Sequence, residues 1–308
     1  MTVVQPRTIS VPASRSETPK PRDEELDLFG LTHPGKVRKE NQDHFLVCTV
    51  HPEVVIHGTS LSTTDHLPLR GERLATLMLV ADGVGGGTAG AEASQLATEA
   101  ITRYVSSTLR CYHAAGSAGD HQFYEALHAA ALEAHEAVSV ESAARGDSQP
   151  GGRGMATTLT LAIAVWPWLY VVQVGDSRCY RFSRGVLTQV TRDQTIAQHL
   201  VEQGILQPEQ AAKSPLSSVL SSSIGGREAT PEVSRIDIRR RDASAVLLCS
   251  DGLNREVSDE EIAECLGKME SSEQACRYLL DLALTRGGRD NITVVVARVR
   301  PGDEPEPD

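Results

Sequence analysis

Three apolar runs in this chain each end on an aspartate that is followed at once by a glycine or a serine. They are the stretches LATLMLVAD, YVVQVGD and AVLLCSD, which end at Asp82, Asp176 and Asp251. Continuous apolar runs of this length, bounded by turn residues, are typical of buried strands. The first run continues into a glycine-rich turn and then into a helical pattern. We therefore expect a sheet whose strands deliver carboxylates to one end.

Carboxylates gathered at one end of a sheet repel one another, and a buried charge is costly unless it is paired or bound to a metal. A hard divalent cation relieves this repulsion, and Mg²⁺ or Mn²⁺ suits a site made of carboxylates and water. Two such ions that share a carboxylate hold and deprotonate a water between them. Taken singly, each motif has a simpler interpretation, since an Asp-Gly pair after a strand is usually a turn and Asp176 could cap one through Ser177. The shared pattern favours the cation site.

Two further acids and an arginine extend this set. Asp290 precedes the last apolar run, although Asp290-Asn291 could form a plain Asx turn. Asp43 follows the basic segment GKVRKENQ, which contains Arg38. An arginine beside a carboxylate–metal centre would bind an oxyanion such as phosphate; the alternative is a surface arginine in a basic loop. Arginine, metal ions and an activated water together indicate phosphoester hydrolysis.

The order of the elements predicts the fold class. Apolar runs predict strands at 45–48, 74–81, 157–165, 168–174, 179–182, 245–250 and 292–299. Helical spacing and capping sequences predict helices over 92–109, 123–140, 196–203, 258–266 and 271–284. Strands, two long helices, more strands, and then helices with a closing strand favour an α+β fold of antiparallel sheets with helices packed outside. Because no repeat or linker divides the chain, we expect one domain.

Composition and charge exclude several classes of protein. The 308 residues are 40% hydrophobic and 23% charged, which is ordinary for a globular chain with a large core. A net charge of −11 without a dense basic cluster disfavours nucleic-acid binding, and no apolar stretch is long enough to span a bilayer. The six cysteines form no CxxC pair and no HExxH motif occurs, which disfavours a disulfide framework and zinc chemistry. We expect a free-standing cytoplasmic protein with neither a nucleic-acid nor a membrane partner.

Both ends of the chain differ from its middle. Residues 1–27 are rich in Pro, Ser, Thr and charge, and this composition predicts a disordered tail. Residues 28–300 form the predicted domain, and 301–308 are a short acidic tail that contains proline. Within the domain, the Ser- and Gly-rich segment 213–230 is weakly patterned and predicts a surface flap.

Seven motifs, taken in order, resemble one known family. They are GKVRKENQD, ADGVGGGTAGAEAS, GMATTLT, VGDSRCYRF, TRDQTIAQHLVEQG, LLCSDGLNREVSDEEI and GGRDNITVVVARV. Together they cover about Leu28 to Arg300 and resemble the metal-dependent serine/threonine protein phosphatases (the PPM or type 2C family), bacterial branch. The resemblance implies a four-layer α-β-β-α sandwich of two antiparallel sheets flanked by helices. It also implies two Mn²⁺ or Mg²⁺ ions at one end of that sandwich.

The resemblance implies a role for each acid near the metals. Asp82 would bridge both ions, and the backbone carbonyl of Gly83 would ligate one of them. Asp251 and Asp290 would ligate the other ion. Asp43 would hold the waters that are bound to the metals.

The resemblance assigns further residues to the substrate and to a third ion. Arg38 would bind the substrate phosphate. Asp176, with help from Asp251, would bind a third, weaker cation, and residues 207–230 would form a variable flap that influences substrate choice. Many relatives carry a histidine after the Asp-Gly pair as a candidate general acid, but this chain has Val84 there. Another donor would therefore protonate the leaving oxygen, or the enzyme would favour good leaving groups.

The implied activity is hydrolysis of phosphoserine and phosphothreonine on proteins. A bridging water, its pKa lowered by two cations, would attack phosphorus in line without a phosphoenzyme. The implied partners are phosphoprotein substrates, including a cognate Ser/Thr kinase and its targets, and we expect a monomer that opposes kinase signalling. A non-catalytic pseudophosphatase is one alternative, but it would need a lost ligand. A phosphatase of an anti-sigma-factor antagonist is another, but those relatives usually lack the equivalent of Arg38.

Overall fold

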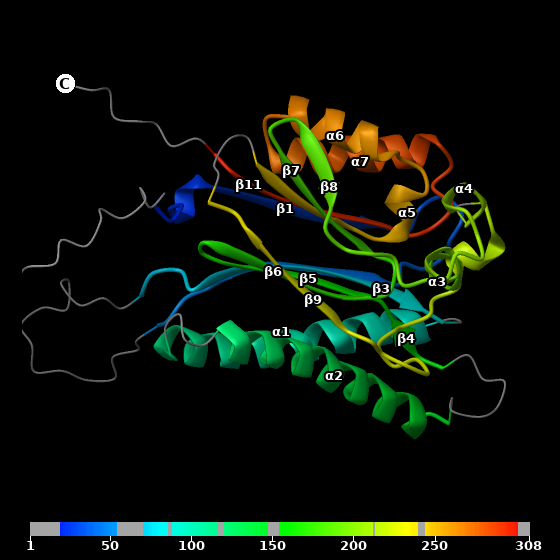
Figure 1. The fold of residues 1–308 in the computed structure, drawn as a ribbon, viewed down its shortest axis with the longest axis horizontal. Helices are drawn as coiled ribbons and strands as arrows, with labels where there is room; N and C mark the ends of the chain where they lie inside the picture. The colour runs from blue at the N-terminus through cyan, green and yellow to red at the C-terminus, as the bar shows by residue number, and fades with distance from the viewer. Residues whose placement is uncertain are drawn as a thin grey trace, which may run out of the picture.

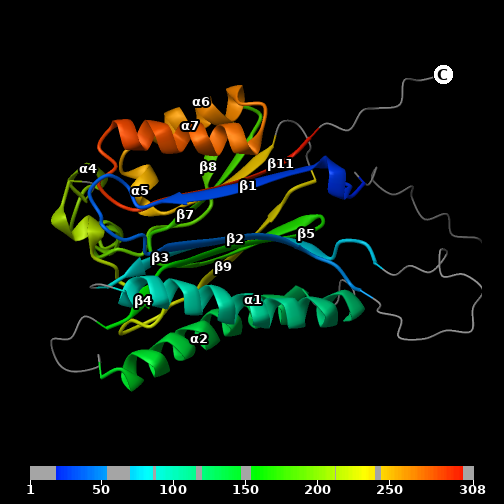
Figure 2. The same cartoon turned by 180° about the vertical axis from the view of Figure 1, so that it is seen from behind.

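Two antiparallel sheets pack face to face and carry helices on both outer faces, as Figure 1 shows for the computed structural model of the chain. The described residues are 19–53, 70–85, 88–115, 120–146, 154–211, 213–239 and 244–300. Figure 2, the view from behind, shows α6 (Asp259–Lys268) and α7 (Ser272–Thr285) over one sheet and α1 (Ala89–Ala115) and α2 (Asp120–Ala144) under the other. The predicted four-layer α-β-β-α sandwich is therefore confirmed.

The first sheet has five strands in the order β1-β11-β10-β7-β8. Their bounds are Leu26–His33 for β1, Ile292–Val299 for β11, Ala245–Cys249 for β10, Arg178–Ser183 for β7 and Val186–Gln189 for β8. Its outer face is covered by α6 (Asp259–Lys268) and α7 (Ser272–Thr285). The predicted capping box at the start of α6 is confirmed, because Ser258 and Glu261 exchange side-chain and backbone hydrogen bonds.

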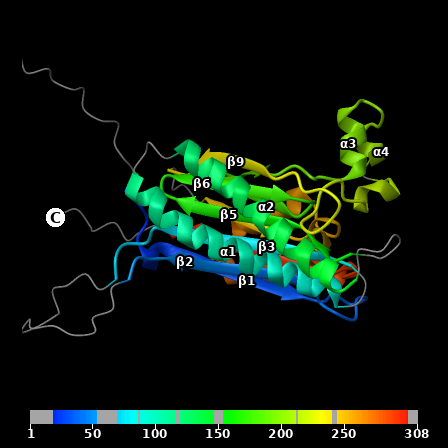
Figure 3. The same cartoon turned by 90° about the horizontal axis from the view of Figure 1, so that it is seen from below.

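The second sheet runs β2-β3-β5-β6-β9, with β4 paired to β3. The bounds are Asp43–Val50 for β2, Ala75–Val84 for β3, Ala156–Thr157 for β4, Leu159–Val165 for β5, Trp168–Val174 for β6 and Glu232–Asp237 for β9. Its outer face is covered by α1 (Ala89–Ala115) and α2 (Asp120–Ala144). Figure 3 shows both helices lying across this sheet, while α3 (Ile196–Glu202) and α4 (Pro208–Ala211) lie beyond one end of it.

The central strand β3 shows why its sequence is a continuous apolar run. Leu77 and Leu79 pack toward the helices of the second sheet, whereas Met78 and Val80 pack between the two sheets. Successive side chains of a strand point to opposite faces, so a strand buried on both faces needs apolar residues at every step. The acid near the end of β3, Asp82, therefore lies at one end of the sandwich.

In the described part of the chain, three strands lie where the sequence analysis predicts none. The strand predicted at 45–48 is confirmed as β2, but it is the second strand and not the first. The first strand is β1, which pairs along its whole length with β11. Its sequence lacks a clean pattern because Gly30 leaves room for the ring of Phe45, while the Asp27 carboxylate accepts a hydrogen bond from the Ser272 amide. The other two, β8 and β9, are edge strands, and their half-polar sequences carry little periodicity.

The described structure begins before the predicted domain boundary at residue 28. The buried guanidinium of Arg73 donates to the Pro21 carbonyl oxygen at 2.6 Å and pairs with the Asp23 carboxylate. Charged residues that composition assigns to a tail are thus neutralised against the domain. Residues 1–18 of the predicted tail, and the tail 301–308, lie outside the described residues. Among the helices described, none is both long and apolar enough to cross a membrane.

Candidate active site

The five aspartates singled out in the sequence meet at one end of the sandwich. Asp43 begins β2 and lies directly opposite Asp82, near the end of β3. Asp251 follows β10, and Asp290 precedes β11, the antiparallel neighbour of β10. The chain crosses from the second sheet to the first between β6 and β7, and Asp176 lies in that crossing. The predicted convergence is confirmed, whereas the role of each acid stays a prediction.

Asp43 is held by both sheets and is only 3% exposed. Its Oδ2 atom accepts hydrogen bonds from Ser250 Oγ at 2.7 Å and from Thr293 Oγ1 at 2.6 Å. Both donors belong to the first sheet or its extension, so these bonds fasten the two sheets at the site end. The other carboxylate oxygen, Oδ1, is buried and has no hydrogen-bond partner. Such an atom is costly unless a donor or a cation reaches it.

Burial and mutual repulsion raise the pKa values of these acids. Burial lifts the pKa of Asp82 well above its usual range, and the charges of Asp43, Asp251, Asp176 and Asp290 raise it further. Burial raises the pKa of Asp43 to about 6 and that of Asp176 to about 7, and the Asp251 charge contributes to both shifts. Burial also raises the pKa of Asp251. A cluster of acids that resist ionising together is one that a bound cation would stabilise.

Two arginines supply positive charge to this cluster. Arg38 Nη2 donates to Asp290 Oδ2 at 2.7 Å, and this hydrogen bond raises the pKa of the arginine. The Arg38 side chain stays 57% exposed, so most of its five N–H donors remain open to a ligand. On the other side, Arg255 Nη2 lies 2.5 Å from Asp251 Oδ2. Arg38 therefore contacts the carboxylate cluster, as predicted, and is not an isolated surface arginine.

The glycines that follow two of the acids allow close backbone approach. A Cβ atom on Gly83 would lie 2.2 Å from the Gly90 carbonyl oxygen, and one on Gly252 would lie 2.0 Å from the Asn291 carbonyl oxygen. Real Cβ atoms cannot come so near, so any side chain would push these segments apart. The Gly83 amide also donates to the Gln42 carbonyl oxygen at 3.1 Å. The Asp-Gly pattern is thus explained by packing, and the ligand role of the Gly83 carbonyl stays a prediction.

Asn291 fixes the loop that carries Arg38, a role that the sequence analysis missed. Its Oδ1 atom accepts from the Gln42 amide at 2.9 Å, and its Nδ2 atom donates to the carbonyl oxygens of Pro34 and Glu40 at 3.0 and 2.9 Å. One buried amide therefore joins both ends of this loop to the start of β11. An asparagine between an acid and an apolar strand was the available signal.

Hydroxyl groups hold Asp82 in place, and they were also missed. The Asp82 amide donates to Thr158 Oγ1 at 2.9 Å, and Thr157 Oγ1 donates to the Asp82 carbonyl oxygen at 2.9 Å. Thr158 Oγ1 in turn lies 2.8 Å from Ser177 Oγ, beside Asp176. These contacts link the end of β3 to the crossing between the sheets. The paired threonines of GMATTLT, directly before an otherwise apolar strand, were the signal.

The donor set fits hard divalent cations. In the described parts of the chain, no group of three or more His, Cys, Asp or Glu side chains has the geometry to hold a metal ion. Mg²⁺ keeps several waters in its coordination shell, so water can complete the ligation where the acids do not close on a common point. The unpartnered Asp43 Oδ1 atom and the raised pKa of Asp82 both indicate more carboxylate oxygens than the neighbouring hydrogen-bond donors and cations of the protein can satisfy. The residues present therefore fit Mg²⁺ or Mn²⁺.

The flap predicted at 207–230 lies beside the carboxylates. It contains α4 and a short turn of 3-10 helix at Pro215–Ser218. Residues of this segment and of α3 face Asp176 and Asp251 across a polar cleft of about 630 Å³. Val84, at the end of β3, is 44% exposed and carries no proton to donate. Of this segment, residue 212 lies outside the described part of the chain.

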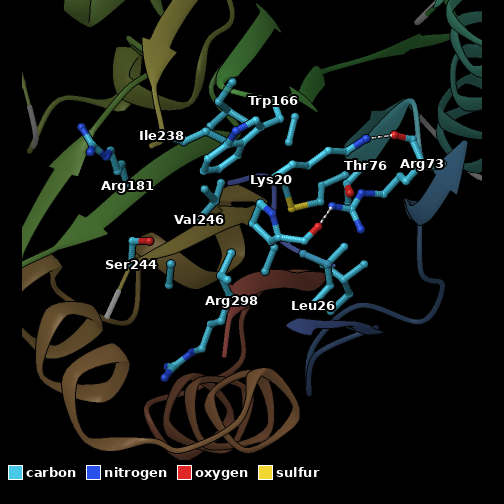
Figure 4. A pocket seen from close by; sticks show the side chains of 18 residues that line it. Lys20, Leu26, Arg73, Thr76, Trp166, Arg181, Ile238, Ser244, Val246 and Arg298 are labelled. Carbon is cyan, nitrogen blue, oxygen red and sulfur yellow. Dashed lines mark hydrogen bonds between the residues drawn. The ribbon is translucent and has the colours of Figure 1, made fainter. Parts of the chain in front are cut away.

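A second pocket lies between the sheets at the opposite end of the sandwich. Figure 4 shows its apolar lining, which includes Leu26, Trp166 and Ile238. Lys20 reaches its rim and donates to the Arg73 carbonyl oxygen. The described residues that line this pocket include no acid, so it is not the cation site.

Fold and site together define a class of protein. Antiparallel sheets packed face to face make an α-β-β-α sandwich, and five acids and an arginine at its open end form an oxygen-rich cluster that suits a hard cation. The family model for protein phosphatase 2C matches residues 61–285, which is most of the chain. The chain belongs to the protein phosphatase 2C family.

Comparison with known proteins gives relatives within this family. The serine/threonine protein phosphatase PstP of Mycobacterium tuberculosis is 40% identical over 225 residues, which are 73% of this chain and 40% of the relative. The chain thus matches less than half the length of that protein. The serine/threonine phosphatase stp of Listeria monocytogenes is 27% identical over 265 residues, 86% of this chain and 92% of the relative. A crystal structure of the PstP catalytic domain with two manganese ions has a TM-score of 0.67 and 31% identity, covering 90% of this chain and 99% of that one.

Proposed function

We propose that this chain is a protein serine/threonine phosphatase that hydrolyses phosphoserine and phosphothreonine on other proteins. The observation that carries the proposal is the convergence of five aspartates, with Asp82 among them, at one end of the sandwich. Burial and four neighbouring acids raise the pKa of Asp82 far above normal, which suits a carboxylate shared by two cations. Arg38 lies at the edge of the same cluster and is exposed enough to meet a phosphate. Membership of the family supports the same activity.

The metal ligands that we propose are Asp82, Asp251, Asp290 and the backbone carbonyl of Gly83. Two Mn²⁺ or Mg²⁺ ions bound there would supply positive charge for the phosphate and would activate a water for attack on phosphorus. Asp43 would orient the site water, because Ser250 and Thr293 occupy its Oδ2 atom and leave Oδ1 free to accept a hydrogen bond. Asp176 would add to the binding of a third, weaker ion.

Arg38 would orient the substrate phosphate. One of its N–H groups is bound to Asp290, which fixes the guanidinium at the site, and the others would donate to phosphate oxygens. Val84 offers no proton to the leaving oxygen. The enzyme would therefore work best on substrates with good leaving groups, or would protonate the alkoxide from solvent in the cleft.

The finer features of the proposal concern its setting. We propose that residues 28–300, with β1 extending the domain to Leu26, form a catalytic unit that acts as a monomer in the cytoplasm. Its substrates would include a cognate Ser/Thr kinase and the targets of that kinase, so it would oppose kinase signalling. The net charge of −11 argues against nucleic acid as a partner.

Hydrolysis of p-nitrophenyl phosphate and of a phosphothreonine peptide, with Mn²⁺ or with EDTA, tests the proposal. We expect turnover only with metal, and at least about a hundredfold less for Asp82→Asn and Asp251→Asn, because the ions lose carboxylate ligands. Asp237→Asn, which changes a surface acid far from the site, is the matched control. Full activity in both site variants would refute the metal assignment. Metal binding without turnover would instead indicate a pseudophosphatase.

The identity of the substrate needs a separate experiment. Phosphopeptides from cells with and without the protein should differ at the sites of a Ser/Thr kinase and its targets. Enrichment confined to an anti-sigma-factor antagonist would support the alternative substrate.

A further inference from the structure

Arg255 lies between two of the site acids. It follows α5 (Asp251–Asn254), one helical turn after Asp251, so its side chain reaches back over the site. Its Nη2 atom is 2.5 Å from Asp251 Oδ2 and 3.8 Å from Asp176 Oδ2. Both carboxylates are largely buried, with 14% and 8% of their side chains exposed. One guanidinium thus bridges an acid from the turn after β10 and an acid from the crossing between the sheets.

The neighbouring arginine in this cleft is committed elsewhere. Arg178 holds Asp193 through two parallel bonds, Nε to Oδ1 at 2.9 Å and Nη2 to Oδ2 at 2.7 Å. Its Nη1 atom donates to the Tyr180 hydroxyl at 2.9 Å. Among the described residues, the ion pairs of Arg255 are those with Asp251 and Asp176. Of the two arginines in this cleft, Arg255 is therefore the one that pairs with the site acids.

The two acids are the pair that we propose for the third, weaker ion. A divalent ion at that position must displace the guanidinium or share the acids with its charge. Two carboxylates and one guanidinium carry a net charge of −1, which attracts a divalent cation far less than −2 does. The guanidinium is charged at every accessible pH, so its charge opposes a cation beside these two acids throughout the working pH range, although 41% of the side chain is exposed.

We propose that Arg255 takes the place of the third metal ion, so that this chain works with two bound ions and holds a third only weakly. The inference rests on the proposed function for the two ions at Asp82. It assigns Arg255 a positioning role, since the guanidinium fixes Asp176 and Asp251 without contacting the reacting atoms. Replacement of this one side chain should therefore tighten the third site most, with a smaller effect on the ion that Asp251 would ligate.

Isothermal calorimetry of the full chain, titrated with Mn²⁺ and no other ligand, tests this proposal. For Arg255→Ala and Arg255→Gln we expect the weakest class of sites to tighten by at least about tenfold relative to the unaltered chain, because removal of a unit charge within 4 Å strengthens the local field. The double variant Arg255→Ala with Asp176→Asn should lose that gain. Arg255→Lys, which keeps the charge, should stay close to the unaltered protein.

Arg277→Ala is the matched control, since Arg277 also pairs with an acid four residues away, but on the exposed face of α7. Its titration should equal that of the unaltered protein, and circular dichroism should show every variant folded. If Arg255→Ala binds Mn²⁺ like the unaltered chain, and both proteins still bind two ions tightly and hydrolyse phosphoesters, then the role of Arg255 is refuted while the proposed function stands. If neither protein binds two ions or hydrolyses phosphoesters, the proposed function fails.

Discussion

Replacement of Asp43 by asparagine should stabilise the metal-free protein. Asp43 is 3% exposed, and burial raises its pKa from 3.8 to about 6. An acid whose folded pKa lies above its unfolded value contributes fully to stability only below the unfolded pKa, and this contribution is lost as the pH rises through the folded pKa. At pH 8 the ionised Asp43 therefore costs about 2 pKa units, or on the order of 3 kcal/mol.

Asparagine has the same shape and removes this cost, because its side-chain oxygen still accepts from Ser250 and Thr293. We expect Asp43→Asn to raise the free energy of unfolding by about 2 to 3 kcal/mol at pH 8, and by about half as much at pH 5, where much of the aspartate is protonated. Urea unfolding in EDTA, followed by circular dichroism at both pH values, measures the difference. The same variant should lose phosphatase activity with Mn²⁺ present.

Asp237→Asn is the control for this measurement. Asp237 is an exposed acid, and its hydrogen bond with Arg239 lowers its pKa, so its replacement should leave the free energy of unfolding within about 0.5 kcal/mol. A metal-free Asp43→Asn protein that is no more stable than the unaltered chain at pH 8 would refute the reasoning. That result would mean that the bonds from the first sheet offset the whole cost of burying the charge.

Three further changes have expected outcomes. Arg38→Ala should lower kcat/KM for a phosphothreonine peptide about a hundredfold, with partial recovery in Arg38→Lys, because a charge-assisted contact to phosphate is lost. Asp193→Asn should lower the free energy of unfolding in urea by about 3 kcal/mol, since the largely buried Arg178 loses its two-pronged partner; an unchanged midpoint would contradict this. Gly252→Ala should weaken Mn²⁺ binding in calorimetry about tenfold, since its Cβ would lie 2.0 Å from the Asn291 carbonyl oxygen; unchanged affinity would show that the segment relaxes freely.

The sequence predicts the buried parts of this fold well, because burial leaves the strongest pattern. Strand β3 is an apolar run because both of its faces are covered. The start of α6 is visible in the sequence because Ser258 and Glu261 form a capping box. The acids at strand ends are equally visible, since a charge directly after a buried run is unusual. Their convergence at Asp82 follows from antiparallel pairing, which brings strand ends from distant parts of the chain together.

The parts that escape prediction depend on partners far away in sequence. Strand β1 can be recognised only from its partners, because it pairs with β11 and its Gly30 leaves room for the Phe45 ring of β2. Nothing in the neighbouring sequence explains the asparagine at 291. Its side chain is needed because it hydrogen-bonds the backbone carbonyl groups of the distant loop that carries Arg38. Likewise, the bonds from Ser250 to Asp43 exist only once the two sheets have packed.

The same contacts that close the sandwich should also set the affinity of the cation site that we propose. Asp43 is fastened to the opposite sheet by Ser250 and Thr293, so the sheets cannot separate at this end without freeing the acid. The acids, in turn, repel one another across that junction and raise the pKa of Asp82. A cation bound among these acids in the folded chain alone would remove this repulsion and would add RT ln(1 + [L]/Kd) to stability, about 2.7 kcal/mol at a hundred times Kd. Metal affinity and the stability of the contact between the two sheets should therefore be thermodynamically linked. We expect Mn²⁺ to protect the amides of β2 and β10 from hydrogen exchange more than those of β8 and β9.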